Sequence, residues 1–275
     1  MTSAISRSAD LAASYAGHDA EVKPAAGVWN GPDPVDPKEQ LEFFRREGFL
    51  VLRSVLSAEG VQDLYRELDR LAQSYATLPR IRDGIDLEPR QDASRKLPTF
   101  RKIGGICEMS PAFSRLMRNK RILDALHPIM GPVIELYRDV CMMKPARVGR
   151  EKPWHQDSVY WPWDPMNCVS ALTALDDASP ENGCLQVVPR SHTKVYQHYG
   201  HELQVNVSEF QDKTRYVPLR AGDTLIFHSM TLHASEPNRS EQDRRVCIIS
   251  YKSPDLKFIG KGDPPEPYAI SARLN

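Results

Sequence analysis

The stretch RYVPLRAGDTLIFHSMTLHASEPNRSEQDRRVCIISYK, residues 215–252, decides the fold class of this chain. It contains three short runs rich in β-branched and aromatic residues: RYVPL, TLIFHS and RRVCIISYK. The polar turn signals RAGD and SEPNRS lie between these runs. Short strands separated by such turns are typical of an antiparallel sandwich or barrel. The stretch therefore predicts antiparallel β-structure.

The same pattern extends back to Gly131. Three further strand-like runs precede the stretch, and the turn signal SPENG leads into the last of them. The runs are VIELYRDVCMM (133–143), CVSALTALDD (168–177) and GCLQVVP (183–189). We therefore predict a compact β-core over residues 131–255.

The part of the chain before this core has helical periodicity. From Lys38, apolar residues recur at helical spacing until Gly48, which ends the pattern. The strand-like run FLVLRSVL follows, and Ser57 is placed to cap a second amphipathic helix. Helical spacing returns over residues 111–130. We predict that residues 38–130 form a helical support for the β-core.

Three segments lack a sustained period. Residues 1–37 end in the loop-like GPDPVDP and are predicted to be a mobile leader, and residues 256–275 are predicted to be a C-terminal tail. Residues 76–105 are predicted to be a long loop, of the kind that often forms a lid. Such a lid would favour an anionic group, although a solvated charged loop is the alternative. Its basic residues include Arg80, Arg82, Arg101 and Lys102.

Composition limits the class of protein. The 275 residues are 41% hydrophobic and 26% charged, which suits one globular domain, here residues 38–255. Lys+Arg and Asp+Glu both number 36, so no global field attracts nucleic acid or an anionic membrane. No run approaches the roughly 18 apolar residues of a membrane span. A small molecule is the expected partner.

Cysteine usage indicates a compartment. The five cysteines are odd in number and form no CxxC pair, which argues against a disulfide framework. Arg7 and Asp10 interrupt the N-terminus where a signal peptide would need an apolar run. The expected location is the cytoplasm.

Candidate metal ligands lie in the segment PWHQD, residues 153–157. On a strand, His155 and Asp157 would point to the same face because side chains alternate. One imidazole nitrogen and one carboxylate oxygen could then bind a single metal ion, with a third ligand from elsewhere. Two histidines and one carboxylate leave positions on Fe(II) open for O₂ and a chelating co-substrate. A histidine and an aspartate at this spacing are a weak signal alone.

The third ligand could be His228 or His233, because the intervening Ser-Met-Thr can bend the chain. Arg244 opens the last strand-like run, and a planar guanidinium can bind a carboxylate through two parallel hydrogen bonds. Arg245 would face the opposite way. For Arg244 taken alone, a surface arginine is the simpler interpretation.

Together these residues resemble the phytanoyl-CoA dioxygenase family of Fe(II)/2-oxoglutarate-dependent oxygenases, from about residue 38 to residue 255. FFRREGFLVLRSVLS resembles the family's opening helix and strand, and HQDSVYWPW resembles its proximal metal motif. ENGCLQVVPRSH resembles its NG-C-L strand and turn, and HASEPNRS followed by Arg244 resembles its distal series. Four motifs in order are more specific than any one of them.

The resemblance implies a double-stranded β-helix, the cupin-like jelly roll, preceded by an N-terminal helical region. It implies that Fe(II) is bound by His155, Asp157 and His233, and it leaves His228 outside the ligand set. The co-substrates would be 2-oxoglutarate and O₂. Halogenating relatives have a small residue in place of the metal carboxylate, so the presence of Asp157 disfavours halogenation.

Further residues are carried over from the family. Arg244 would pair with the distal carboxylate of 2-oxoglutarate, helped by Ser235, and Gln156 and Lys102 are additional candidate contacts. Near Leu172 the family can have an aromatic residue that this chain lacks. Candidate substrate contacts, for which core packing is the alternative, are Tyr137, Tyr160, Trp161 and Trp163.

The predicted function is oxidation, by default hydroxylation, of a C–H bond of a small organic substrate of secondary metabolism. Succinate and CO₂ would be released. One alternative is a cupin-like metal isomerase or hydrolase that uses the same three ligands without 2-oxoglutarate. Another is a descendant that binds a ligand without catalysis.

Overall fold

The computed structural model describes residues 27–29, 31–76, 84–200 and 202–263. Its larger sheet has the strand order β1 (Phe49–Leu52), β10 (Thr224–His228), β7 (Val169–Ala174), β12 (Arg244–Lys252), β4 (Glu135–Lys144), β3 (Phe100–Gly104) and β2 (Ile85–Leu87). A smaller sheet has the order β5 (Lys152–His155), β11 (His233–Ser235), β8 (Leu185–Val187) and β9 (Arg215–Tyr216). A third, two-stranded sheet pairs β13 (Lys257–Phe258) with β6 (Trp163–Asp164).

The helices lie mainly before the long strands in sequence. They are α2 (Pro37–Glu47), α3 (Ala58–Ala76), α4 (Ile106–Met109), α5 (Pro111–Met117) and α6 (Lys120–Met130), with short 3₁₀ helices η1 (Asp157–Tyr160), η2 (Ser191–Thr193) and η3 (Ser208–Lys213). Gly48, with φ of 83°, ends α2 as its sequence predicted. The Ser57 hydroxyl accepts a hydrogen bond from the Gly60 amide at 3.2 Å, as expected of a cap.

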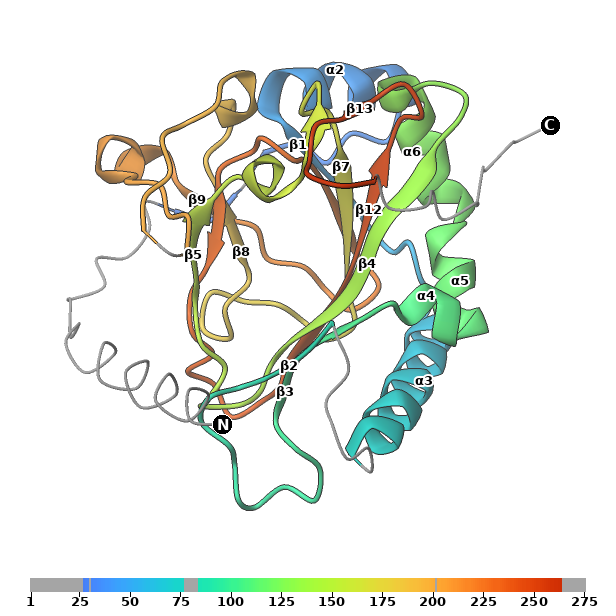
Figure 1. Cartoon of the computed structure of the whole chain (residues 1–275), viewed down its shortest axis with the longest axis vertical. Coiled ribbons are helices and arrows are strands. Elements are labelled where there is room, and N and C mark those ends of the chain that lie inside the picture. Colours follow the sequence, from blue (N-terminus) through green and yellow to red (C-terminus); the bar gives the residue numbers. More distant parts are fainter. Residues whose placement is uncertain (1–26, 30, 77–83, 201, 264–275) are drawn as a thin grey trace.

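The larger sheet separates two parts of the core. On β12, Cys247, Ile249 and Tyr251 pack in the cluster that contains the helices. Val246, on the opposite face, belongs to the cluster between the two sheets. Figure 1 shows α3 to α6 beside the outer face of β4 and β12, with the smaller sheet on the other side. The predicted mainly β class with supporting helices is confirmed.

The predicted loop over residues 76–105 is confirmed for residues 88–99 and is wrong on either side of them, where the structure has helix and strands. The helix α3 continues to Ala76, and β2 and β3 form an antiparallel pair. The strand β3 also pairs with β4, with Lys102 opposite Met142. A partner distant in sequence supplies these hydrogen bonds, so the local pattern does not reveal them. Arg80 and Arg82 lie outside the described residues.

The predicted termini are also too long. Trp29 packs edge-on against Phe43 and Phe49, with ring centroids 5.8 and 5.0 Å apart, so this residue of the predicted leader packs against the core. At the other end, Leu256 is buried and β13 pairs with β6. Residues 1–26 and 264–275 lie outside the described part of the chain.

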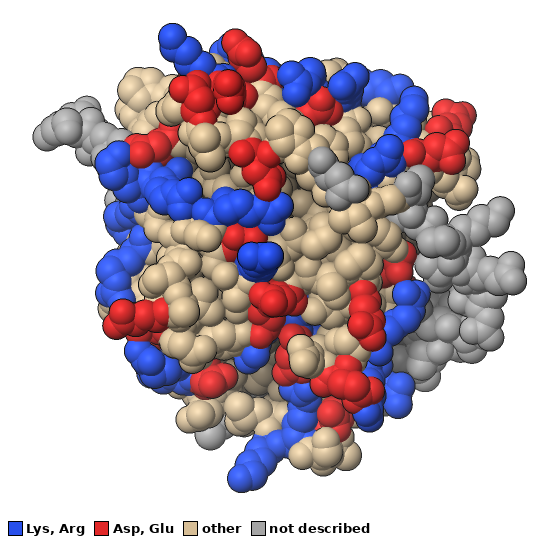
Figure 2. All heavy atoms as spheres, turned by 180° about the vertical axis from the view of Figure 1, so that it is seen from behind, with Lys and Arg blue, Asp and Glu red and all other residues tan. Residues whose placement is uncertain are grey.

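The surface carries both signs of charge. On the face seen in Figure 2, basic and acidic side chains are interspersed over most of the visible area. This agrees with a formal net charge of zero. Among the described residues, no helix is long and apolar enough to cross a membrane.

Candidate active site

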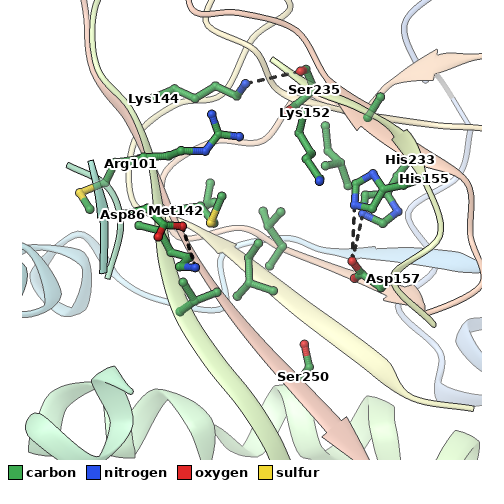
Figure 3. Close-up of a pocket in the computed structure, with 18 of the residues that line it drawn as sticks. Asp86, Arg101, Met142, Lys144, Lys152, His155, Asp157, His233, Ser235 and Ser250 are labelled. Atoms are coloured by element: carbon green, nitrogen blue, oxygen red, sulfur yellow. Dashed lines mark hydrogen bonds and ion pairs between the residues drawn. The ribbon is translucent and has the colours of Figure 1, made fainter. Parts of the chain in front are cut away.

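Three side chains expected to bind metal converge between the two sheets. The strand β11 pairs with β5, and His233 lies directly opposite His155. The Nε2 atoms of His155 and His233 lie 3.5 and 3.7 Å from Asp157 Oδ1. Figure 3 shows the two imidazoles side by side, with the carboxylate facing them. These three residues are thus brought into one cluster.

The prediction that strand alternation aligns His155 and Asp157 is wrong. His155 ends β5, and Asp157 is the first residue of η1, so strand alternation does not align them. A tight turn brings the carboxylate back toward the imidazole instead. The Ser158 amide fixes this turn by donating to the Ser229 carbonyl at 3.1 Å.

Hydrogen bonds orient both imidazoles. His155 Nδ1 lies 2.7 Å from the Pro153 carbonyl, and His233 Nδ1 lies 2.8 Å from the Thr231 carbonyl. Each Nδ1 must carry the proton that it donates, which leaves the Nε2 lone pair facing Asp157. This is the tautomer that a metal ligand needs.

The charge states suit the same purpose. Burial lowers the pKa of His233 to about 4, so its ring is neutral at neutral pH. Burial would raise the pKa of Asp157, but His233 and His155 outweigh it and hold that pKa below the usual value. Two imidazoles and one carboxylate form a donor set that fits Fe(II).

His228 lies outside this cluster, as the resemblance implied. Its Nδ1 accepts a hydrogen bond from the Met230 amide at 3.0 Å, and its Nε2 lies 3.2 Å from Asn167 Oδ1. Both ring nitrogens are therefore occupied.

The cluster faces a cavity of about 370 Å³. Alternate residues of β12 line it, from Arg244 at one end to Ser250 at the other. Val246, Ile248, Leu172 and Phe227 give its walls an apolar character. The cavity can therefore hold a small molecule beside the metal ligands.

Arg244 is a buried cation in this cavity. Its side chain is 5% exposed, and its Nη2 donates to the Gly183 carbonyl at 2.9 Å. Its Nε forms no hydrogen bond with any described residue. Burial lowers its pKa to about 10, which still leaves it charged at neutral pH. A buried, incompletely bonded guanidinium fits a carboxylate ligand. Ser235, two residues after His233, lines the same cavity.

Arg245 faces the opposite way, as expected. Its Nε donates to Asp176 at 2.8 Å, and its guanidinium lies 4.2 Å from the centre of the Tyr65 ring. The two adjacent arginines thus have different surroundings.

The other two expected co-substrate contacts differ from each other. Lys102 lines the cavity, but its Nζ is paired with Asp86 at 2.7 Å. Gln156 does not line it: the Gln156 amide donates to the carbonyls of Lys194 and Met230, and its oxygen accepts from the Tyr196 amide. The side chain of Gln156 is therefore engaged by the backbone, and its contact with the co-substrate stays a prediction.

The four aromatic candidates also divide. Tyr160 and Trp161 line the cavity. Tyr137 and Trp163 do not line it, and they pack with Phe258 and with Trp161 itself in an apolar cluster beside the cavity. Packing against other aromatic rings accounts for the positions of these two residues, and their contact with substrate stays a prediction.

Sequence reasoning missed Lys144. Its Nζ donates to the carbonyls of Arg150 at 2.6 Å, Ser235 at 3.4 Å and Glu236 at 2.7 Å. Burial and the nearby Arg244 lower its pKa well below the ordinary value. The lysine links the end of β4 to the end of β11. Period-2 alternation from Arg138 along VIELYRDVCMMK could have indicated its inward direction.

The fold and the converging ligands place the protein among the jelly-roll metal enzymes. The chain matches the family model described as phytanoyl-CoA dioxygenase (PhyH) over residues 44–246. It is 27% identical over 260 residues to ectoine dioxygenase of Bordetella parapertussis, covering 86% of this chain and 82% of that one. It is 28% identical over 236 residues to peroxisomal phytanoyl-CoA dioxygenase of Mus musculus, and the match covers 80% of this chain and 70% of that one. The chain belongs to the phytanoyl-CoA dioxygenase family of Fe(II)/2-oxoglutarate-dependent oxygenases.

Solved structures confirm the jelly-roll core. EctD from S. alaskensis with 2-oxoglutarate and 5-hydroxyectoine superposes with a TM-score of 0.70 at 22% identity, covering 92% of each chain. The epimerase SnoN in complex with Fe3+, alpha ketoglutarate and nogalamycin RO superposes with a TM-score of 0.67 at 20% identity, covering 84% of this chain and 90% of that one. At these identities the likeness is one of fold.

Proposed function

We propose that this protein is an Fe(II)- and 2-oxoglutarate-dependent hydroxylase of a small organic substrate. In this proposal, His155, Asp157 and His233 bind the iron. The observation that carries it is the placement of this cluster and Arg244 in one cavity. The membership of the family supports the same chemistry.

Bound iron, 2-oxoglutarate and O₂ supply the oxidising power for a C–H bond, with release of succinate and CO₂. The side chains of the protein bind and orient. Arg244 pairs with the distal carboxylate of 2-oxoglutarate, and the Ser235 hydroxyl donates to it. Leu172 and Phe227 form an apolar wall that excludes water from the reacting groups.

Hydroxylation is proposed as the reaction type. Asp157 would occupy the ligand position that is opened to a halide where a small residue replaces the carboxylate, and this disfavours halogenation. Solved structures of similar fold include an epimerase and a carbocyclase, which shows that this fold also supports other outcomes. The small cavity suits a small substrate, which we place in secondary metabolism.

The alternative is a metal isomerase or hydrolase that does not use 2-oxoglutarate. Arg244 argues against it, because a buried cation in the cavity would then lack an anionic partner. All five cysteines are buried and unpaired, which is compatible with the proposed cytoplasmic location.

The test is turnover with isotopically labelled O₂. Purified protein with Fe(II) and 2-oxoglutarate is screened against small molecules for succinate, and products are analysed by mass spectrometry. We expect a product that has gained one labelled oxygen atom. Turnover supported by zinc without 2-oxoglutarate would favour the alternative, and a product that has only lost hydrogen would replace hydroxylation with desaturation.

A further inference from the structure

The cavity has an excess of positive charge. Among the described residues that line it, seven are Lys or Arg and four are Asp or Glu. One of the four acidic residues is Asp157, which the proposed function assigns to the metal. An uncompensated positive field in a confined space attracts an anion.

Three of these cations come from different strands and line the same cavity. Figure 3 shows Arg101 of β3 and Lys152 of β5 reaching into the cavity beside the imidazoles, and Lys144 of β4 directed toward Ser235. Lys144 is fully engaged, since its Nζ donates to three backbone carbonyls. The other two cations are not satisfied to the same degree.

Arg101 is the least satisfied of the three. Its residue is 9% exposed, and its Nη1 forms no hydrogen bond with any described residue. Its Nη2 donates to the Glu151 carbonyl at 3.4 Å. Its carboxylate neighbour, Glu88, lies 3.9 Å from Nη1, beyond hydrogen-bonding distance.

Glu88 is a weak counter-ion. Both of its carboxylate oxygens are buried without a hydrogen-bond partner among the described residues. Burial raises the pKa of Glu88, and burial together with Arg150 lowers the pKa of Arg101. Arg101 therefore retains bonding capacity that Glu88 does not use.

Like Arg101, Lys152 is a cation of the cavity whose bonding capacity is not fully used, and it lies closer in sequence to the metal ligand His155. It lies on β5, three residues before His155. Its Nζ lies 3.3 Å from the Tyr160 hydroxyl and 3.5 Å from Glu202 Oε2, at the limit of a hydrogen bond. The ammonium also lies 5.1 Å from the centre of the Tyr160 ring. It can therefore gain a stronger partner.

We propose that the substrate carries an anionic group, a carboxylate or a phosphate, which binds between Arg101 and Lys152. This inference rests on the proposed function and names the substrate class of that site. Arg244 is then reserved for the co-substrate, and Arg101 determines specificity. The planar guanidinium provides two parallel donors, and the ammonium of Lys152 adds a third.

The first test uses the full-length, metal-free protein, so it does not depend on catalysis. Thermal unfolding is followed while inorganic phosphate or acetate replaces chloride at constant ionic strength. We expect a saturable rise in Tm that persists in Arg244→Gln. In Arg101→Gln the half-saturating concentration should rise about 10- to 150-fold, the range for a charge-assisted pair. Arg101→Lys should restore part of the effect.

The matched control is Arg66→Gln, because Arg66 lies on α3, its side chain is 71% exposed and it is not among the residues that line the cavity. It should respond to phosphate as the unmodified protein does. An equal anion response in Arg101→Gln and the unmodified protein would overturn the proposal. The preferred anion, acetate or phosphate, distinguishes a carboxylate substrate from a phosphorylated one.

The second test uses the iron-loaded protein. Succinate release is measured with hexanoate, hexyl phosphate, hexanamide and hexylamine. Stimulation by the anions only, lost in Arg101→Gln, supports the proposal, and stimulation by the amide or amine only overturns it. A large loss of 2-oxoglutarate affinity in Arg101→Gln would assign the residue to the co-substrate and also overturn it. If no variant binds 2-oxoglutarate, the proposed function fails, while the metal-free experiment still decides the anion site.

Discussion

Arg244 and Arg245 are adjacent in sequence and lie on opposite faces of β12. The first lines the cavity, and the second pairs with Asp176 at 2.8 Å on the outside. Substitution of Arg245 therefore serves as a control for the loss of one positive charge next to Arg244. A role that depends on the cavity should be lost with one arginine and retained with the other.

We predict that Arg244→Gln raises the concentration of 2-oxoglutarate needed for half-saturation by about 10- to 150-fold, because a charge-assisted pair contributes about 1.5–3 kcal/mol. Arg245→Gln should leave this concentration within about 2-fold. Titration of 2-oxoglutarate against the anaerobic Fe(II) protein measures both. An equal effect of the two substitutions would refute the assignment.

His228 provides a pH-dependent term in the stability. Burial and His192 lower the pKa of His228 to about 4 in the folded protein, against about 6.5 when unfolded. Because the folded pKa is depressed, the contribution is complete above about pH 6.5 and is lost as the pH falls toward 4.

We therefore predict that the free energy of unfolding of the metal-free protein falls between pH 7 and pH 5. The loss should be about 1–2 kcal/mol smaller in His228→Gln, because the substituted side chain does not titrate. Denaturant unfolding at the two pH values measures this difference. A parallel fall in both proteins would show that His228 does not contribute.

At the scale of elements, the turn before β8 supports the cavity through its backbone. Gly183 has φ of 80°, and a Cβ there would lie 2.3 Å from the Glu236 carbonyl oxygen. The absence of a side chain at Gly183 thus lets its backbone approach that of Glu236. The carbonyls of these two residues accept hydrogen bonds from Arg244 and Lys144, respectively.

Gly183→Ala should destabilise the protein by about 2–5 kcal/mol, since a left-handed alanine costs about 1–2 kcal/mol and the overlap adds about 1–3 kcal/mol. Gly200→Ala is the matched control, because it has φ of 69° and nothing within 4 Å of its Cβ position. Gly200→Ala should lower the free energy of unfolding only by the cost of a left-handed alanine, about 1–2 kcal/mol. Denaturant unfolding distinguishes them, and equal losses would exclude a role for the close approach.

The elements also show how far sequence reasoning extends. The runs that became β4, β7, β10 and β12 were predicted because period-2 and turn signals are local. The pairing of β3 with β4 was missed because both partners are needed to see it. The position of Asp157 was predicted for the wrong reason, since η1 and not strand alternation brings it to His155.

Individual side chains were harder to predict than strands. The resemblance named His233 over His228, and the structure places His233 in the cluster. It also named Gln156, whose amide is instead engaged by three backbone groups. Lys144 was not assigned a role, and Arg101 was assigned to a charged loop and not to a strand, because their burial depends on strands that pack only in the complete fold.

At the scale of the whole molecule, the proposed ligands connect the two sheets. His155 and His233 belong to the smaller sheet, and Arg244 belongs to the larger one. A ligand that joins them stabilises only the folded state, by about 2.7 kcal/mol at a concentration of 100 times its Kd.

We predict that Fe(II) raises Tm and that 2-oxoglutarate raises it further. In Arg244→Gln the first increment should remain and the second should be much reduced, because only the second requires the larger sheet. Differential scanning calorimetry under anaerobic conditions, with removal of iron by a chelator as the reverse step, measures both increments. Loss of both increments in Arg244→Gln would contradict this separation.

The most direct test of the central claim is the anaerobic absorbance spectrum of the protein with Fe(II) and 2-oxoglutarate. We predict a weak visible charge-transfer band, which should be lost in His233→Ala and retained in His228→Ala. Absence of the band in the unmodified protein, together with tight binding of zinc or manganese, would contradict the assignment of this cavity as an iron and 2-oxoglutarate site.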